Sequence, residues 1–356
     1  MASLGLRDRD AIITNKGLIF RVFGNSHPSD AYICDVEYAP SEIFGSKNPK
    51  AFRSRGQSVF YKFYEDEGIK FIEKHYPHYF VFHEMLQAKV VGVNHSNIVK
   101  VRKPDKKLAE LLRKKPQDEL VAALHKALEF TLQYSNLSTE DFGVFGSLLH
   151  DFYHPRFSDL DFIVYGREKL VKLREALQEL YHDNRSLLKN EFESDKPIRG
   201  KHWRFQNLNA KEFVWHQQRK LIYALFKDET SGRIIKTEFE PVKDWKEIHS
   251  EYDSKARILQ KGWVKLVARI IDDSDAPFIP SVYGIEPLHI LDGTKETEEA
   301  VRIVSFMEEF RMQAFKDEKV YVEGNLEEVA SQKGSFYQIA LTYCPRYCEQ
   351  ALKVVP

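Results

Sequence analysis

The chain has 356 residues, of which 43% are hydrophobic and 13% aromatic, and its 53 basic and 53 acidic residues leave no net charge. This length and composition exclude a disordered chain and favour two or three domains. The zero net charge excludes a uniformly basic surface, so any contact with nucleic acid must depend on local patches. Three cysteines exclude a disulfide-rich scaffold and favour a reducing compartment.

The sequence contains no recognisable membrane span or secretory leader. No apolar run approaches the length of a membrane-spanning helix, and the start MASLGLRDRD does not have the pattern of a signal peptide. We therefore expect a cytoplasmic protein without a membrane partner. The pattern does not indicate an oligomeric state.

Residues 1–105 are predicted to form an α+β domain. Short β-rich runs alternate with turns, and Asn15-Lys16-Gly17 has the composition of a hairpin turn. One helix is predicted over 66–75, and a boundary is expected in the charged, proline-containing segment 101–116. No motif in this domain indicates its role. The predicted strands are 11–14, 17–23, 31–38, 58–63, 79–82 and 89–93.

Residues 106–248 are predicted to form a second domain in which helices and strands are mixed. Apolar residues recur at helical spacing over 117–134, which predicts an amphipathic helix. The polar stretch between 183 and 220 is expected to be irregular. The other predicted elements are a helix over 167–182 and strands over 142–145, 159–165, 221–226 and 233–241.

Residues 249–356 are predicted to form a β-rich domain. Its runs are separated by Asp, Gly and Pro turns, and the run over 300–314 is equally compatible with a helix. Short elements at this spacing favour a small barrel of the OB type. The predicted runs are 262–271, 278–283, 300–314, 319–329 and 335–341.

The segment FGVFGSLLHDFYHPRFSDLDFIVYG, which begins at residue 142, combines a strand, a Gly-Ser turn and two spaced acids. Gly146 permits a tight turn close to a phosphate, and Ser147 would open a short helix whose free amides favour phosphate oxygens. Asp159 and Asp161 are two residues apart on a strand, so their carboxylates share a face and repel one another unless a cation lies between them. Hard oxygen ligands of this kind suit Mg²⁺ carried by a nucleoside triphosphate.

Gly-Ser followed by a spaced Asp-x-Asp between apolar strands resembles the motif of the nucleotidyltransferase superfamily typified by DNA polymerase beta. The resemblance covers roughly 117–245, and the flanking regions resemble archaeal chains known as predicted nucleotidyltransferases. It implies an α+β chain whose core is a mixed sheet backed by helices. It also implies two Mg²⁺ ions and transfer of a nucleoside monophosphate from ATP or another nucleoside triphosphate.

The superfamily usually supplies a third carboxylate from a later strand, and the segment IIKTEFEP at 234–241 occupies that place here. The resemblance assigns the third acid to Glu238, because its neighbours Thr237 and Phe239 resemble the flanking apolar positions. A glutamate in place of the usual aspartate either reaches a metal or acts as a general base. Glu240 lies on the same strand face, and the alternative is that both glutamates simply face solvent.

Two cationic segments are further candidates for binding phosphate. Arg156 lies in the loop between the Gly-Ser turn and the acids, where superfamily members often place a cation near the triphosphate. The alternative is an exposed loop arginine without this role. The segment RGKHWR has the composition that stacks a base and holds backbone phosphate, or else is a solvated loop with one packed tryptophan. Its candidate residues are Arg199, Lys201, Trp203 and Arg204.

Three function hypotheses follow from these residues. The first is nucleotidyl transfer to an RNA acceptor, favoured by the chain length, the expected barrel and the cationic segment at 199–204. The second applies the same chemistry to a small molecule or a protein hydroxyl. The third is a catalytically idle adaptor that binds RNA or a protein, but an idle protein has no physical reason to retain two mutually repelling acids.

Overall fold

The computed structural model describes residues 5–356, and the chain divides into two compact units. The predicted domains 1–105 and 106–248 fall mostly within one unit, which differs from the three-part division expected from sequence. Their shared unit has a physical cause, because Ala11, Ile19 and Tyr38 form one buried cluster with Leu149 and Phe152. Unit 1 runs to His83 and continues over Ala88–Leu188 and Leu225–Tyr252, and unit 2 comprises Glu84–Gln87, Lys189–Ala224 and Asp253–Pro356.

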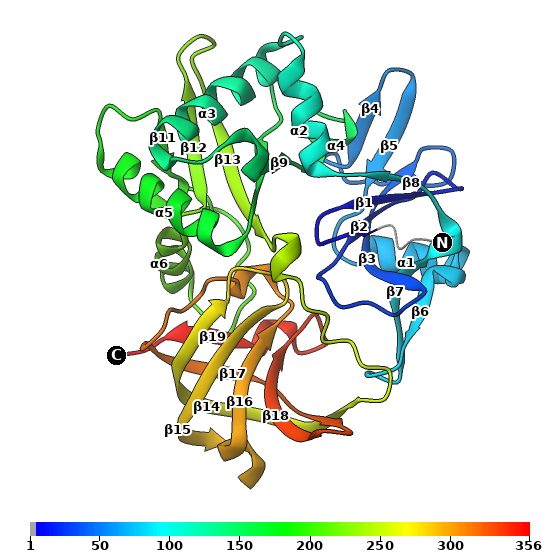
Figure 1. Ribbon diagram of the computed structural model, residues 1–356, viewed down its shortest axis with the longest axis vertical. Coiled ribbons are helices and arrows are strands. Elements are labelled where there is room, and N and C mark those ends of the chain that lie inside the picture. Colours follow the sequence, from blue (N-terminus) through cyan, green and yellow to red (C-terminus); the bar gives the residue numbers. More distant parts are fainter. Residues whose placement is uncertain (1–4) are drawn as a thin grey trace. The chain divides into compact units, whose positions relative to one another are not determined.

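Unit 1 begins with an eight-stranded sheet in the order β4-β5-β3-β2-β1-β8, with β7 pairing to β3 and β6 (Figure 1). The six predicted strands, the helix and the hairpin turn are confirmed, whereas β4 and β8 were missed. Both are edge strands that carry charged residues, which weakens the apolar alternation. The elements are β1 Ala11–Thr14, β2 Ile19–Val22, β3 Ala31–Pro40, β4 Phe52–Arg55, β5 Ser58–Lys62, α1 Glu67–His75, β6 Phe80–His83, β7 Ala88–Asn94 and β8 Ile98–Arg102.

A second sheet has the order β11-β12-β13-β10-β9 and is mixed, because β10 pairs in parallel with β13 and antiparallel with β9. Helices α3 and α5 pack against one another over this sheet (Figure 1). The α+β class is thereby confirmed. The elements are α2 Pro104–Arg113, α3 Glu119–Ser135, β9 Phe142–Val144, α4 Gly146–His150, β10 Leu160–Tyr165, α5 Arg167–His182, β11 Leu188–Asn190, β12 Tyr223–Asp228 and β13 Arg233–Val242.

The expectation that 183–220 is irregular is wrong at β11 and again in its last third, where α6 spans Ala210–Lys220 in unit 2. Its start was readable from sequence. The Asn209 side chain accepts hydrogen bonds from the amides of Lys211 and Glu212, and the Glu212 carboxylate accepts one from the Asn209 amide, which completes a capping box.

The remaining strands of unit 2 close into a barrel. β14 pairs with both β15 and β17, β16 pairs with β15 and in parallel with β18, and β18 pairs with β17, so the ring is complete. The run over 300–314 resolves into β16 and a short 3-10 helix at Glu308–Phe310. The strands are β14 Arg257–Asp275, β15 Ser281–Asp292, β16 Ala300–Ser305, β17 Lys319–Ser331, β18 Gly334–Leu341 and β19 Ala351–Val354.

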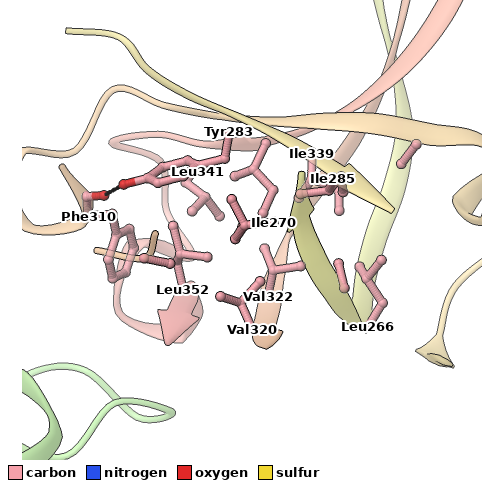
Figure 2. Close-up of a cluster of buried hydrophobic side chains, with 14 of the residues drawn as sticks. Leu266, Ile270, Tyr283, Ile285, Phe310, Val320, Val322, Ile339, Leu341 and Leu352 are labelled. Carbon is pink, nitrogen blue, oxygen red and sulfur yellow. Dashed lines mark hydrogen bonds between the residues drawn. The ribbon is translucent and has the colours of Figure 1, made fainter. Parts of the chain in front are cut away.

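Alternate residues of the barrel strands fill its interior with apolar side chains. Figure 2 shows this cluster, in which Leu266 and Ile270 come from β14 and Val322 from the neighbouring strand β17. The Tyr283 hydroxyl donates a hydrogen bond of 2.5 Å to the Phe310 carbonyl, which satisfies a buried polar group at the edge of the cluster. None of the helices in the described part of the chain is long and apolar enough to cross a membrane.

Candidate active site

The Gly-Ser turn brings the backbone against the Asp161 carboxylate. β9 ends at Val144, and the Phe145 amide donates a hydrogen bond of 2.9 Å to the Asp161 carbonyl. Gly146 follows with φ +63°, and a Cβ at this position would collide with Asp161 Oδ2 and lie 3.2 Å from Asp161 Cγ. Glycine is therefore required twice over, for the left-handed backbone and for the close approach of the carboxylate.

The parallel pairing of β10 and β13 places Glu238 directly opposite Asp161. Asp159 lies two residues before Asp161, just outside β10, and its charge acts on Asp161. Burial raises the pKa of Asp161 to about 8, and the charges of Glu238, Asp159 and Glu240 add to the rise. The negative charges of these acids therefore act on one partly buried carboxylate at this end of β10 and β13. The sequence analysis expected such repulsion between the two aspartates.

Asp159 is exposed and lies just before β10, next to two cations that the sequence analysis did not single out. Crowding by protein atoms raises the pKa of Asp159 although the residue stays exposed, and the charges of Lys236 and Arg233 oppose the rise. The Arg233 guanidinium also donates to the carbonyls of Pro155 (2.6 Å) and Ser158 (3.3 Å), which ties down the loop before Asp159. A signal for Lys236 was present, because it precedes Glu238 by two residues on the same strand face.

Glu238 and Glu240 have different partners. Lys236 Nζ lies 2.6 Å from Glu238 Oε1, and this pair is partly exposed. Glu240 is 4% exposed, and its Oε2 accepts a hydrogen bond of 3.1 Å from Arg9, in the turn before β1. The Arg9 guanidinium also lies over the Phe145 ring. Glu240 thus belongs to a buried ion pair, whereas Glu238 remains beside Asp161 at the sheet edge.

Ser147 lies in the first turn of α4, partly exposed, and its carbonyl accepts a hydrogen bond of 2.9 Å from the Phe152 amide. Its assignment to phosphate binding stays a prediction. Arg156 is 76% exposed, and its Nε lies 3.4 Å from Glu119 Oε1. The structure therefore gives Arg156 a surface ion pair, and its contact with a triphosphate also stays a prediction.

The cationic segment at 199–204 belongs to unit 2, whereas the acids belong to unit 1. Lys201 and Arg204 are exposed, and Arg199 forms an exposed ion pair of 2.6 Å with Asp195. Trp203 is half-buried, packs against Phe205 and Phe213, and donates its indole N–H to the Leu208 carbonyl at 2.6 Å. The packed-tryptophan alternative therefore describes its ring, and stacking of a base on Trp203 remains a prediction.

The carboxylates of Asp159, Asp161 and Glu238 are chemically suited to Mg²⁺, although the three side chains are not gathered around a single metal position. Within residues 5–356, no three His, Cys, Asp or Glu side chains are gathered so that they could hold one metal ion. Glu238 forms an ion pair with Lys236 and Glu240 forms one with Arg9, so each glutamate faces a protein cation. The mutual repulsion of Asp159, Asp161 and Glu238 is the feature that a divalent cation would relieve.

Comparison with known proteins shows that the chain is similar in sequence to an archaeal protein. Uncharacterized protein MJ1086 of Methanocaldococcus jannaschii is 26% identical over 343 residues, which cover 94% of each chain. No protein-family model matches the sequence. No solved structure matches it either.

Proposed function

We propose that the protein is a metal-dependent nucleotidyltransferase, which moves a nucleoside monophosphate from a nucleoside triphosphate to an acceptor hydroxyl. One observation carries the proposal: Gly146 lies against the Asp161 carboxylate, which in turn faces Glu238 across two parallel strands. A backbone turn that could admit phosphate, next to acids whose mutual repulsion a cation would relieve, fits binding of a metal–nucleotide complex.

In the proposed reaction, the acceptor oxygen bonds to the α-phosphorus while the bond to the β-phosphate oxygen breaks. The electron pair of that bond stays on the departing pyrophosphate. Bound Mg²⁺ would polarise the phosphoryl oxygens and neutralise their charge. Asp159 and Asp161 would hold it, and Glu238 would complete the ligand set or accept the proton of the acceptor hydroxyl. The Gly146-Ser147 turn would position the phosphates.

RNA is the proposed acceptor. The support lies in unit 2, where a closed five-stranded barrel resembles the OB architecture that binds oligonucleotides. Exposed Lys201 and Arg204 in the same unit could hold backbone phosphate, which a chain without net charge must do locally.

The test of the function is to incubate the protein with each α-³²P-labelled nucleoside triphosphate, Mg²⁺ and total RNA, and to identify what carries label. Label on RNA that disappears with EDTA is the expected result. Label on a small metabolite or on protein would keep the transferase proposal and overturn the RNA acceptor. No label on any acceptor supplied, including a cell extract, would leave the catalytically idle adaptor as the better account.

Glu238 and Glu240 should separate catalysis from stability. Glu238→Gln is expected to lower transfer by ~100-fold with little change in melting temperature, because it removes a carboxylate beside Asp161. Glu240→Gln should retain most of the activity but lose ~1–3 kcal/mol of unfolding free energy, since Arg9 then keeps only Asp8, at 3.6 Å, as a buried counter-charge. Labelled-nucleotide transfer and urea denaturation measure the two effects. Equal, mild losses of activity in both variants would place the third acid elsewhere.

Replacing Arg199, Lys201 and Arg204 together with alanine should weaken RNA binding and flatten its salt dependence. Each phosphate contact by Lys or Arg releases counterions, so losing contacts reduces the slope of log affinity against log salt. Trp203→Ala should cost roughly 1–3 kcal/mol of RNA binding if a base stacks there. Gel shifts at several salt concentrations measure both, with nucleotide binding as the control that should stay constant. An unchanged salt slope in the triple variant would remove this segment from the RNA site.

A further inference from the structure

The eight-stranded sheet of unit 1, called the N-terminal sheet below, packs one face on α4, the helix that begins at Gly146. The ring centroid of Tyr38 lies 5.3 Å from that of His150 and 5.4 Å from that of Phe152. The ring centroids of Phe60 and Phe152 are 4.6 Å apart. Arg102 Nη1 lies 3.3 Å from His150 Nδ1 and 3.4 Å from the Leu149 carbonyl. Strands β3, β5 and β8 are therefore anchored to α4 and to the residues just after it.

Two cations lie on this same face. Lys62 is directly opposite Tyr38 in the antiparallel pair β3–β5, and Arg53 is directly opposite Phe60 in the pair β4–β5. Directly opposed residues of an antiparallel pair carry their side chains on one face of the sheet. Lys62 and Arg53 consequently extend the surface formed by Tyr38 and Phe60, next to α4.

The face that carries Lys62 and Arg53 is the one that contacts His150 at the end of α4 and Phe152 just after it. Lys62 and Arg53 are both partly exposed. In the described part of the chain neither forms an ion pair with a carboxylate. Arg53 Nη1 donates to the carbonyls of Lys50 (2.7 Å) and Phe52 (2.8 Å), and Lys62 Nζ lies 5.9 Å from the centroid of the Tyr64 ring. Across residues 5–356 the positive charges of both side chains are therefore not neutralised by an acid and can attract a further anion.

We propose that the N-terminal sheet completes the nucleotide site, with Lys62 and Arg53 binding the β- and γ-phosphates of the nucleoside triphosphate. The inference rests on the proposed function and gives the N-terminal sheet a role within it. As the acceptor oxygen bonds to the α-phosphorus, the electron pair of the broken phosphoanhydride bond stays on pyrophosphate. Lys62 and Arg53 neutralise this developing charge, which the acids of β10 and β13 would otherwise repel.

Steady-state kinetics of Lys62→Ala, Arg53→Ala and the double variant test the inference. Lys89→Ala, which removes an exposed lysine of β7, is the matched control. We expect kcat/KM for the nucleoside triphosphate to fall by ~10–100-fold in Lys62→Ala and further in the double variant. The Ki of pyrophosphate should rise in parallel while melting temperatures stay unchanged, and Lys62→Arg should recover part of the loss. Wild-type values of kcat/KM and Ki in the double variant would overturn the inference.

A binding experiment separates this inference from the proposed function. Calorimetric titration with inorganic tripolyphosphate and Mg²⁺ requires no acceptor and no turnover. Weaker binding by the double variant than by wild type and Lys89→Ala supports the cation site, and equal binding by all three overturns it. If the wild type labels no acceptor, the proposed function fails, and the titration still decides whether Lys62 and Arg53 bind a polyphosphate.

Discussion

Asp161→Asn is expected to lower nucleotidyl transfer by ~1,000-fold while making the metal-free protein more stable. The activity falls because the variant loses a ligand of the ion that stabilises charge in the transition state, an effect of several kcal/mol. The stability rises because burial and three neighbouring acids disfavour the charged carboxylate in the folded protein. Transfer assays and urea denaturation in EDTA measure the two quantities.

The sign of the stability change follows from the raised pKa of Asp161. Its folded pKa of about 8 exceeds the ordinary value of 3.8, so between these values the folded chain holds a proton that the unfolded chain has lost. The free energy of unfolding of the wild type therefore falls as pH rises through this window, and Asp161→Asn removes that fall. At pH 8 the variant should be at least ~1 kcal/mol more stable.

Magnesium provides the control for this prediction. Mg²⁺ should raise the melting temperature of the wild type, because a cation bound to the folded acids relieves their repulsion, and it should have little effect on Asp161→Asn. Near-normal transfer by the variant would show that the catalytic site lies elsewhere. A variant less stable than wild type in EDTA would show that the carboxylate is stabilised by its surroundings.

Gly146→Ala is expected to cost ~2–4 kcal/mol of unfolding free energy and to reduce transfer by ~100-fold or more. The left-handed backbone at Gly146 disfavours any Cβ, and the new methyl group would also collide with Asp161 Oδ2. Relief of that collision must move the carboxylate or the turn, and a shift of about 1 Å in a catalytic group is enough for a loss of this size. Denaturation and transfer assays test both parts.

Gly232→Ala is the matched control for the cost of placing an alanine in the left-handed backbone conformation. Gly232 has φ +71° in the turn between β12 and β13, and a Cβ there meets nothing within 4 Å. This variant should lose only the ~1–2 kcal/mol of a left-handed alanine and keep its activity. If Gly146→Ala lost no more unfolding free energy and no more activity than Gly232→Ala, the close approach of Gly146 to Asp161 would not matter for stability or transfer.

The candidate site was predictable as far as it depends on neighbours in the chain. Gly146-Ser147 and Asp159–Asp161 are recognisable because turn chemistry and strand alternation act over a few residues, and β10 and α5 follow from the same periodicities. Edge strands β4 and β8 were not predicted, because their charged residues mask the alternation of apolar and polar residues. Helix α6 escaped although its capping box was present in the sequence.

The sequence by itself determined the acid pair, the glycine turn, the α+β class and the β-rich C-terminal region. The motif resemblance already favoured Glu238 as the third acid, but only the tertiary structure gave the two glutamates different neighbours, because strand register places Glu238 opposite Asp161. Glu240 instead pairs with Arg9, which is 231 residues away in the chain. Only packing of the eight-stranded sheet on α4 placed Lys62, the partner of Tyr38 in β3–β5, on the face that contacts α4. Such contacts form between segments that no local pattern links, since the burial of apolar faces such as Tyr38 on Phe152 selects them.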